Sequence, residues 1–201
     1  MTATLYIVRH GNTFEKGEVV TRVGGRTDLP LSPSGEAQGL ALARHFKEKG
    51  VVFSSARSGP LKRTRRTAEL ILAAQTAAPE LTIDLFLREI DYGPDENRPE
   101  TEVIARIGVA ALEAWERQSI PPRDWRIDPA AVIGNWQETF GELRGATGAH
   151  LIVTSNGIAR FALLAAGAAA ADAKLATGAY GVIALGASDE TLSGWNIRPS
   201  A

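Results

Sequence analysis

Short apolar runs alternate with longer amphipathic stretches along the chain. The first run, Leu5 to Val8, is followed by polar residues and Gly11, a pattern typical of a strand that is covered on both faces. Similar runs predict strands at residues 51–55, 81–87 and 180–186. A further strand is expected to begin at residue 151 and to end in a turn by residue 157.

The stretches between these runs carry apolar residues at helical spacing. Ser32 is expected to cap a helix whose first position is Pro33, because a serine side chain accepts a hydrogen bond from the first turn and proline fits there. Further helices are expected over residues 61–75, 103–114 and 133–143, and from about Ile158 onward. Trp136 and Phe140 are expected to lie in the core.

Strands that alternate with helices predict a three-layer α/β/α fold with a mostly parallel central sheet. No repeat or low-complexity linker divides residues 1–201, so a single domain is expected. Open parallel sheets bind ligands at the carboxyl ends of their strands. The segments that follow the strands are therefore expected to gather in one crevice: RHGNT, SSARSGPLKRTRRT, REIDYG and SNGIAR.

Composition narrows the classes of function. The 22 Lys and Arg residues nearly balance the 23 Asp and Glu residues, so neither nucleic acid nor an anionic membrane is an expected partner. Cysteine is absent, which excludes a thiol nucleophile, a disulfide and thiolate metal ligands. The N-terminus shows no signal peptide, so a cytoplasmic location is expected. The Ala-rich segment 162–179 contains Asp172 and Lys174 and is expected to be a buried helix followed by a loop.

Several side chains in the predicted crevice suit the chemistry of a phosphoryl group. Arg9 and Arg63 offer planar, permanently charged donors to phosphate oxygens. Neutral His10 can attack phosphorus while a neighbouring cation stabilises the charge on the oxygens. Glu89 can protonate the leaving oxygen if its surroundings keep the carboxyl protonated. Gly11 is expected to let the backbone approach the ligand closely.

The motif RHGNT, together with TDLPLSPSG, LKRTRRTAE and LREIDYG, resembles the histidine phosphatase superfamily, which has the phosphoglycerate-mutase-like fold. The resemblance covers residues 5 to about 185, although the helices between residues 100 and 145 match only in general character. It implies that His10 is the phosphorylated residue and that Glu89 is the general acid. It also implies that Arg9 and Arg63 bind the phosphate. Gly11, Ser155 and Asn156 are further expected phosphate-binding residues, because Gly11 leaves room for the ligand and the other two can donate neutral hydrogen bonds. Residues expected to bind the rest of the substrate are Asn12, Thr13, Arg22 and Arg26.

The sequence departs from this family at the last catalytic strand. The family ends that strand in a pattern like Val-Ser-His-Gly, whereas the letters VTSNG place Ser155 where the second histidine would stand. His45 lies in the first predicted helix and His150 at the opposite end of the strand, so both are expected to be structural or exposed. Removing one oxyanion-type donor costs about 10²–10³ in rate, and enzymes commonly accelerate reactions by about 10⁶ or more. A serine at position 155 is therefore expected to lower turnover more than it weakens phosphate binding.

Other charged residues near the motifs have ordinary explanations. A helix over the basic run 57–66 points only one or two cations inward, so Arg63 is the expected site residue and Arg57 a weaker candidate. The acidic residues of segment 91–100 are expected to form a polar loop and a helix start, because the arginines already neutralise phosphate charge without a metal. These acidic residues are Asp91, Asp95, Glu96 and Glu100.

The most direct interpretation is a metal-independent phosphomonoester hydrolase that acts on a small phosphorylated metabolite through a phosphohistidine at His10. Phosphoryl transfer of the phosphoglycerate-mutase type is an alternative, although mutases of this fold tend to be longer. A second alternative is a decayed phosphatase that binds a phospho-ligand without turnover, which Ser155 favours. No cofactor is expected, and assembly as a homodimer is left open.

Overall fold

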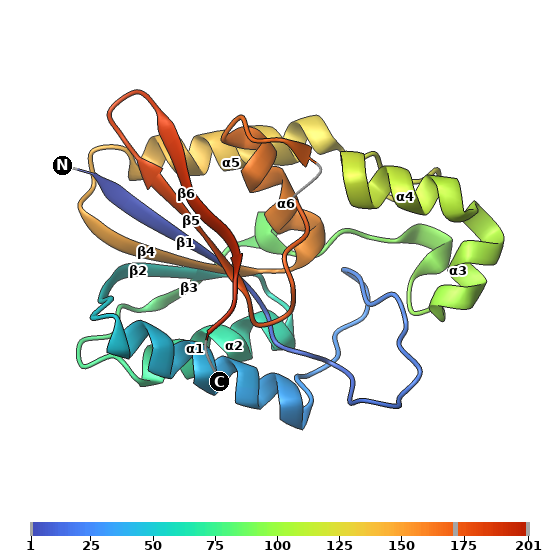
Figure 1. Ribbon diagram of the computed structural model, residues 1–201, viewed down its shortest axis with the longest axis horizontal. Helices are drawn as coiled ribbons and strands as arrows, with labels where there is room; N and C mark the ends of the chain where they lie inside the picture. Colours follow the sequence, from blue (N-terminus) through green and yellow to red (C-terminus); the bar gives the residue numbers. More distant parts are fainter. Residues whose placement is uncertain (1, 171–172, 200–201) are drawn as a thin grey trace.

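The computed structural model describes residues 2–170 and 173–199, and its centre is a six-stranded sheet in the order β3-β2-β4-β1-β5-β6 (Figure 1). The strands are β1 (Ala3–Arg9), β2 (Phe53–Ser58), β3 (Leu81–Ile83), β4 (Gly148–Thr154), β5 (Tyr180–Leu185) and β6 (Glu190–Ile197). Neighbouring strands from β3 to β1 pair in parallel, whereas β5 pairs antiparallel with both β1 and β6. The prediction of a mostly parallel sheet is confirmed.

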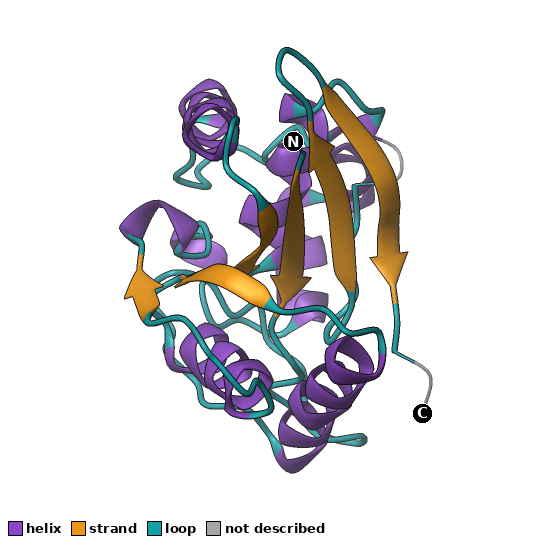
Figure 2. Cartoon of the chain, turned by 90° about the vertical axis from the view of Figure 1, so that its left-hand side faces the viewer, coloured by secondary structure: helices purple, strands orange, loops and turns teal. Residues whose placement is uncertain are grey.

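Helices cover both faces of the sheet and make the three predicted layers (Figure 2). On one face lie α1 (Pro33–Glu48) and α2 (Lys62–Ala73), and on the other lie α5 (Pro129–Leu143) and α6 (Asn156–Ala165). The helices α3 (Glu100–Ile107) and α4 (Val109–Gln118) extend beyond the edge of the sheet where β1 ends (Figure 1). These two helices therefore stand opposite the carboxyl ends of the central strands.

Alternation along β1 divides the core between the two faces of the sheet. Leu5 and Ile7 pack in the cluster that includes residues of α5 and α6, whereas Val8 packs with α1 and α2. Trp136 and Phe140 of α5 are fully buried, as expected. Because β1 lies in the middle of the sheet, the residues that follow it emerge at the centre of the carboxyl edge.

Helix α1 begins where the sequence predicts. The Oγ atom of Ser32 accepts a hydrogen bond from the Gly35 backbone N–H at 3.3 Å, and Pro33 occupies the first turn. Helix α5 begins in the same way, because the Asp128 carboxylate accepts from the backbone N–H groups of its first turn, next to Pro129. Both starts are fixed by local sequence alone.

Several expected elements have different bounds in the structure. Strand β4 begins at Gly148 rather than at residue 151, and α5 begins at Pro129 rather than at residue 133. Strand β2 begins and ends later than the expected range 51–55. The expected strand 81–87 is only the short β3, because the Asp84 carboxylate accepts from the Phe86 backbone N–H and turns the chain into a 3₁₀ helix, Leu85–Leu87. The expected single helix over 103–114 is two helices, since Gly108 has a φ of 81° and interrupts the helical backbone.

The sequence predicts no strand after residues 180–186, but β6 pairs antiparallel beyond β5. The sequence of β6, ETLSGWNI, is largely polar and contains Gly194. It is therefore not one of the apolar runs from which the strands were predicted. Such a composition suits an edge strand with much of its surface exposed.

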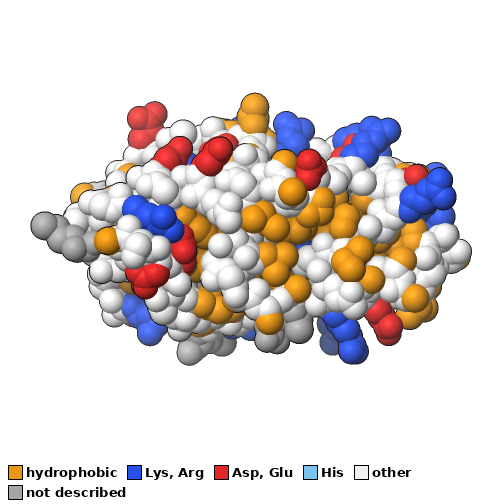
Figure 3. All heavy atoms as spheres, turned by 90° about the horizontal axis from the view of Figure 1, so that it is seen from above, with side chains coloured by type: hydrophobic (Ala, Val, Ile, Leu, Met, Phe, Trp, Pro, Cys, Tyr) orange, Lys and Arg blue, Asp and Glu red, His pale blue; other side chains and the backbone are white. Residues whose placement is uncertain are grey.

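No helix among the described residues is both long and apolar enough to cross a membrane. In segment 162–179, helix α6 ends at Ala165 and the chain continues mainly as loop, while Asp172 lies outside the described residues. Figure 3 views the molecule from above and shows Lys and Arg side chains interspersed with Asp and Glu on that face. Positive and negative side chains are thus mixed on this face, in line with the near balance of charge in the sequence.

Candidate active site

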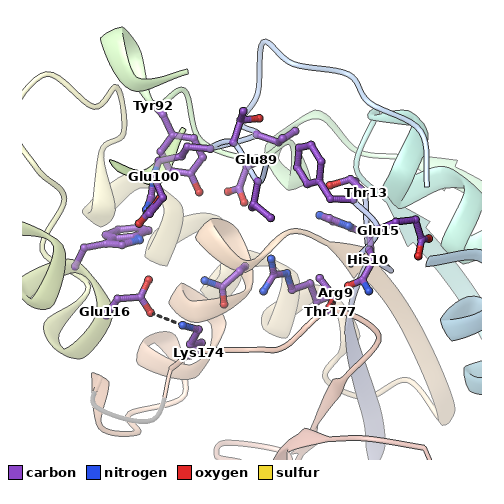
Figure 4. A pocket seen from close by; sticks show the side chains of 18 of the residues that line it. Arg9, His10, Thr13, Glu15, Glu89, Tyr92, Glu100, Glu116, Lys174 and Thr177 are labelled. Carbon is purple, nitrogen blue, oxygen red and sulfur yellow. Dashed lines mark hydrogen bonds and ion pairs between the residues drawn. The ribbon is translucent and has the colours of Figure 1, made fainter. Parts of the chain in front are cut away.

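A cavity of about 580 Å³ opens where β1 and β4 end (Figure 4). We call one part the inner end; it contains Arg9, His10, Glu89 and Asn156. We call the opposite part the outer end; it contains Arg22, Tyr92, Glu100, Trp115, Glu116 and Lys174. Residues of segments that follow three different strands meet at the inner end, as the sequence predicts.

Two hydrogen bonds fix the tautomer of His10. Its Nδ1 atom lies 2.7 Å from the carbonyl oxygen of Gly11, which can only accept, so Nδ1 carries the proton. Its Nε2 atom lies 3.2 Å from Nε of Arg63, which can only donate, so Nε2 presents its lone pair. The ring is therefore neutral, and Nε2 is the nitrogen without a proton.

The surroundings of His10 maintain this neutral form. Burial lowers the pKa of His10 well below its usual 6.5, and the positive charges of Arg63 and Arg9 lower the pKa further. The hydrogen bond to the Gly11 carbonyl acts in the opposite direction and is a smaller effect. At neutral pH the imidazole keeps the unprotonated nitrogen that nucleophilic attack requires.

Arg63 is a fully buried cation in the first turn of α2. Its Nη1 atom donates to the Thr27 carbonyl oxygen at 2.8 Å, and its Nη2 atom donates to the Gly24 carbonyl oxygen at 3.2 Å. These bonds aim the Nε–H group at His10. The rest of the basic run in α2 is exposed, so the expectation that one or two cations of this run point inward is confirmed; the exposed cations are Lys62, Arg65 and Arg66.

Arg9 lines the inner end from the last position of β1. Its Nη1 atom donates to the Leu175 carbonyl oxygen at 2.8 Å. Its Nε atom is buried and has no hydrogen-bond partner among the described residues. A charged donor without a partner, next to a neutral imidazole, favours an anion at this position.

Glu89 lines the inner end of the cavity opposite Arg9 and His10 (Figure 4). Its Oε1 atom accepts from the Ile90 backbone N–H at 2.9 Å, and its Oε2 atom accepts from the Gly157 backbone N–H at 3.2 Å. A Cβ added at Gly157 would lie 2.1 Å from Oε1. Glycine in the first turn of α6 therefore makes room for this carboxyl group.

Ser155 and Asn156 are neighbours at the start of α6 but have different surroundings. Ser155 is fully buried, does not line the cavity, and its Oγ atom has no hydrogen-bond partner among the described residues. Asn156 does line the cavity, and its Oδ1 atom accepts from the Leu175 backbone N–H at 2.8 Å. The amide NH₂ group of Asn156 is therefore the donor that this turn offers to the cavity.

Gly11 is needed for a different reason from the expected one. It does not line the cavity, and its backbone N–H donates to Oγ1 of Thr67 at 3.2 Å. A Cβ added at Gly11 would lie 2.4 Å from the carbonyl oxygen of Gly35 in α1. Glycine at this position permits the close approach of a helix rather than of a ligand.

The remaining candidates divide between the cavity and the surface. Asn12, Thr13 and Arg22 line the cavity. Arg26 lies outside it, where its Nε atom donates to Oδ1 of Asp91 at 2.9 Å. Arg57 also lies outside the cavity and pairs with Glu142 at 2.7 Å. The sequence does not separate these cases, because each of the three arginines follows a predicted strand, although the structure places Arg57 inside β2.

Most of the acidic residues in segment 91–100 are neutralised by arginines. Asp91 lies within salt-bridge distance of Arg26 and Arg126, whereas Glu96 accepts backbone N–H groups. The other two pairs are Asp95 with Arg106 and Glu100 with Arg22. Within residues 2–170 and 173–199, no group of three or more His, Asp or Glu side chains forms a candidate metal site.

His45 and His150 have structural contacts away from the cavity, as expected. The Nε2 atom of His45 hydrogen-bonds to the Tyr180 hydroxyl at 2.7 Å, and Nδ1 of His150 hydrogen-bonds to Oγ of Ser55 at 2.8 Å. Neither is available to take the place of a second histidine at Ser155.

Most residues of the outer end are not indicated by the sequence. Trp115, Glu116 and Lys174 lie outside every motif, and they reach the cavity only because α4 and the segment after α6 extend past the sheet edge. Tyr92 belongs to the motif LREIDYG, which is the one signal that could have indicated it.

Comparison with known protein families gives a match over nearly the whole chain. The profile described as "Histidine phosphatase superfamily (branch 1)" matches residues 5–198. "Probable phosphoglycerate mutase GpmB" of Escherichia fergusonii is 40% identical over 124 residues, which are 61% of this chain and 53% of that protein. The protein of the same name in Salmonella typhi is 34% identical over 116 residues, or 58% of this chain and 49% of that protein. The chain thus matches about half the length of these relatives.

Solved structures share the fold at low sequence identity. A mycobacterial glucosyl-3-phosphoglycerate phosphatase superposes with a TM-score of 0.78 at 18% identity, covering 98% of this chain and 99% of that one. A phosphoserine phosphatase from Entamoeba histolytica superposes with a TM-score of 0.75 at 18% identity, covering 97% of each chain. Both comparisons confirm the phosphoglycerate-mutase-like fold.

Proposed function

Because the chain belongs to the histidine phosphatase superfamily, branch 1, we propose that it hydrolyses phosphate monoesters through a phosphohistidine at His10. The observation that carries this proposal is the fixed neutral tautomer of His10, whose Nε2 lone pair lies beside two arginines. A neutral imidazole next to bound positive charge is the arrangement that attack on a phosphoryl dianion needs.

In the first step, Nε2 of His10 forms a bond to phosphorus while the bond from phosphorus to the ester oxygen breaks. Glu89, in its protonated form, gives its proton to the departing alcohol. Once Nε2 is bonded to phosphorus it no longer accepts from Arg63, so the Arg63 Nε–H turns to a phosphoryl oxygen. Arg9 binds another oxygen through donors that have no protein partner.

In the second step, a water molecule attacks phosphorus and the N–P bond breaks. The Glu89 carboxylate takes a proton from that water, which restores the carboxyl for the next cycle. The products are inorganic phosphate and a neutral His10. No metal enters either step, because the arginines supply the positive charge at the phosphoryl oxygens.

Asn156 is the best placed substitute for the missing second histidine. Its side chain lines the cavity at the start of α6, where the positive end of the helix dipole adds to the amide NH₂ donor. A neutral amide donor is weaker than an imidazolium, so we expect slower turnover rather than none.

The test is hydrolysis of p-nitrophenyl phosphate by the wild type and by His10→Ala over a range of pH. We expect His10→Ala to lose at least about a thousandfold in rate, as nucleophile removal does in other enzymes. His45→Ala is the matched control, since His45 is bonded to Tyr180 outside the cavity. Exhaustive chelation should leave the wild-type rate unchanged. An active His10→Ala protein, or activity that a divalent metal restores after chelation, would reject the mechanism.

Two alternatives have specific observations behind them. The names of the relatives favour phosphoglycerate mutase chemistry, which conversion of 3-phosphoglycerate with and without a bisphosphate primer would reveal. The buried Ser155 favours a protein that binds phospho-ligands without turnover. Tight phosphate binding together with no hydrolysis of any phosphoester would support that second alternative.

A further inference from the structure

The outer end of the cavity is where the alcohol part of a phosphate ester would lie. In Figure 4, Glu100 and Glu116 lie on the side of the cavity away from His10, with Lys174 facing Glu116. A phosphoryl group bound at His10 therefore directs its ester oxygen, and the group attached to it, toward these side chains. Their charges decide which alcohols fit.

Arg22 of the outer end is already neutralised by this chain. Its Nη2 atom donates to both carboxylate oxygens of Glu100, at 2.5 and 2.6 Å. The guanidinium also lies against the faces of Tyr92 and Trp125, with 5.3 and 5.0 Å from Cζ to the ring centroids. Only 11% of the Arg22 side chain is exposed, so the guanidinium is held in place by these contacts. Its buried Nε atom has no hydrogen-bond partner among the described residues, but the charge of the group is already offset by Glu100.

Lys174 is neutralised in the same way on the opposite wall. Its Nζ atom lies 3.2 Å from Oε2 of Glu116 in α4, and the dashed line in Figure 4 marks this ion pair. A ligand carboxylate at this wall would meet the negative charge of Glu116 together with the positive charge of Lys174. The pair offers no net attraction for an anion.

The other cation of the cavity rim, Lys16, has an exposed side chain. In bulk water and salt an exposed ammonium gives little attraction to an anion. Glu15, which also lines the cavity, accepts from the Ser34 backbone N–H at 2.7 Å. Among the described residues that line the outer end, each cation thus has a carboxylate partner.

Building on the proposed function, we propose that the alcohol part of the substrate is uncharged and carries hydroxyl groups, so that the enzyme selects phosphate esters of neutral polyols or sugars over phosphorylated carboxylic acids. A hydroxyl group both donates and accepts, so it can bond to a carboxylate and to a cation of the same pair without adding charge. A carboxylate gains no net attraction from either intact pair and has to break an ion pair to reach its cation.

The sharpest substrate pair is glycerol 3-phosphate and 3-phosphoglycerate, which differ by a CH₂OH group in place of a carboxylate. For the wild type we expect kcat/KM to be at least about tenfold higher for glycerol 3-phosphate. Equal values, or a preference for 3-phosphoglycerate, would overturn the proposal while leaving phosphatase activity itself intact.

Variants test whether the two ion pairs cause the selectivity. Glu100→Gln and Glu116→Gln each leave one cation without its carboxylate, and that cation can then attract the carboxylate of 3-phosphoglycerate. In each variant the kcat/KM for glycerol 3-phosphate divided by that for 3-phosphoglycerate should therefore fall several-fold. Glu142→Gln is the control, because it removes the nearer carboxylate partner of Arg57 outside the cavity, where Asp84 remains 3.9 Å away, and it should leave the ratio unchanged. Ratios that do not move in the cavity variants, or that move equally in the control, would contradict the proposal.

A failure of the proposed function gives a different result. If the wild type hydrolyses neither ester and no p-nitrophenyl phosphate, then the hydrolase proposal fails. The selectivity is then measured as equilibrium binding of the same two esters to the wild type. Tighter binding of glycerol 3-phosphate supports the inference, and tighter or equal binding of 3-phosphoglycerate rejects it.

Discussion

At the scale of single residues, two hydrogen bonds and two charges determine how His10 can react. The Gly11 carbonyl holds the proton on Nδ1, and Arg63 faces Nε2. Burial and the two arginines then keep the ring neutral. In the proposed mechanism the same two arginines stabilise the negative charge of the phosphoryl group, so one arrangement serves both the nucleophile and its target.

Ser155 gives a prediction about stability. Because its buried Oγ atom has no partner among the described residues, Ser155→Ala should not lower the free energy of unfolding and should raise it by up to about 1 kcal/mol. Ser155→His forces an imidazole into a fully buried position and should cost about 1–3 kcal/mol through overpacking. Urea denaturation of the three proteins measures both changes.

A histidine at position 156 separates an active enzyme from a decayed one, because Asn156 lines the cavity and Ser155 does not. We expect Asn156→His to change turnover modestly in either direction. A gain of about 10²–10³, the value of one oxyanion-type donor, would instead indicate an enzyme that decayed when it lost its second histidine. Phosphate affinity is measured in parallel, because a donor that acts equally on ground and transition states changes binding alone.

Sequence reasoning predicted which residues gather at the inner end but not what each one contacts. Arg9, His10 and Glu89 follow strands, so parallel topology alone brings them together. The contact partner of Gly11 is a helix more than twenty residues away, and the unpartnered state of Ser155 depends on every neighbour of the buried turn. These contacts are set by tertiary packing and are not encoded in the local sequence.

At the scale of elements, the break between α3 and α4 shapes the outer end of the cavity. Gly108 joins the two helices with a φ of 81° and a ψ of 157°. This turn lets Glu100 of α3 and Glu116 of α4 both reach the cavity. A continuous helix over the same residues could not place both carboxylates in this way.

Gly108→Ala should therefore lower the free energy of unfolding by about 1–3 kcal/mol, the usual cost of an unfavourable backbone conformation. No atom lies within 4 Å of the added Cβ, so the cost comes from the backbone alone. Gly134→Ala is the matched control, because it also adds a Cβ to open space but lies within helix α5. That variant should gain about 0.5–1 kcal/mol. A stabilising Gly108→Ala would show that the two helices are not fixed by this turn.

Elements were predictable where local chemistry decides them. Helix α1 has a serine cap and a proline at its start, and both act within four residues. Strand β6 was not predictable because its polar sequence becomes a strand only through pairing with β5. The apolar residues 85–87 likewise look like strand until Asp84 turns the chain.

At the scale of the whole molecule, all three histidines have lowered pKa values. Burial is the largest cause in each case, and a nearby cation adds to it: Arg63 for His10, Lys49 for His45 and Arg57 for His150. In the unfolded chain these histidines bind protons below about pH 6.5. The folded protein resists that protonation, so the unfolded state binds more protons as the pH falls.

We therefore predict that the histidines do not reduce the free energy of unfolding above about pH 6.5. Below that pH the free energy of unfolding decreases as the pH falls toward the pKa values of the folded protein. The lowered pKa values of paired carboxylates such as Asp91 and Asp95 act at lower pH and do not explain a decrease in this window. Urea denaturation at pH 7.5 and pH 5.5 measures the change. His45→Asn should reduce the pH dependence, and equal stability at the two pH values would contradict the prediction.

The phosphohistidine at His10 is the central claim, and trapping the phosphoenzyme tests it most directly. The enzyme is mixed with a phosphate ester labelled in its phosphoryl group and quenched rapidly. We predict that the label becomes covalently bound to the wild type, survives alkali and is lost in acid, as an N–P bond requires, and that His10→Ala carries no label. A label that survives acid, or equal labelling of His10→Ala, would contradict the account.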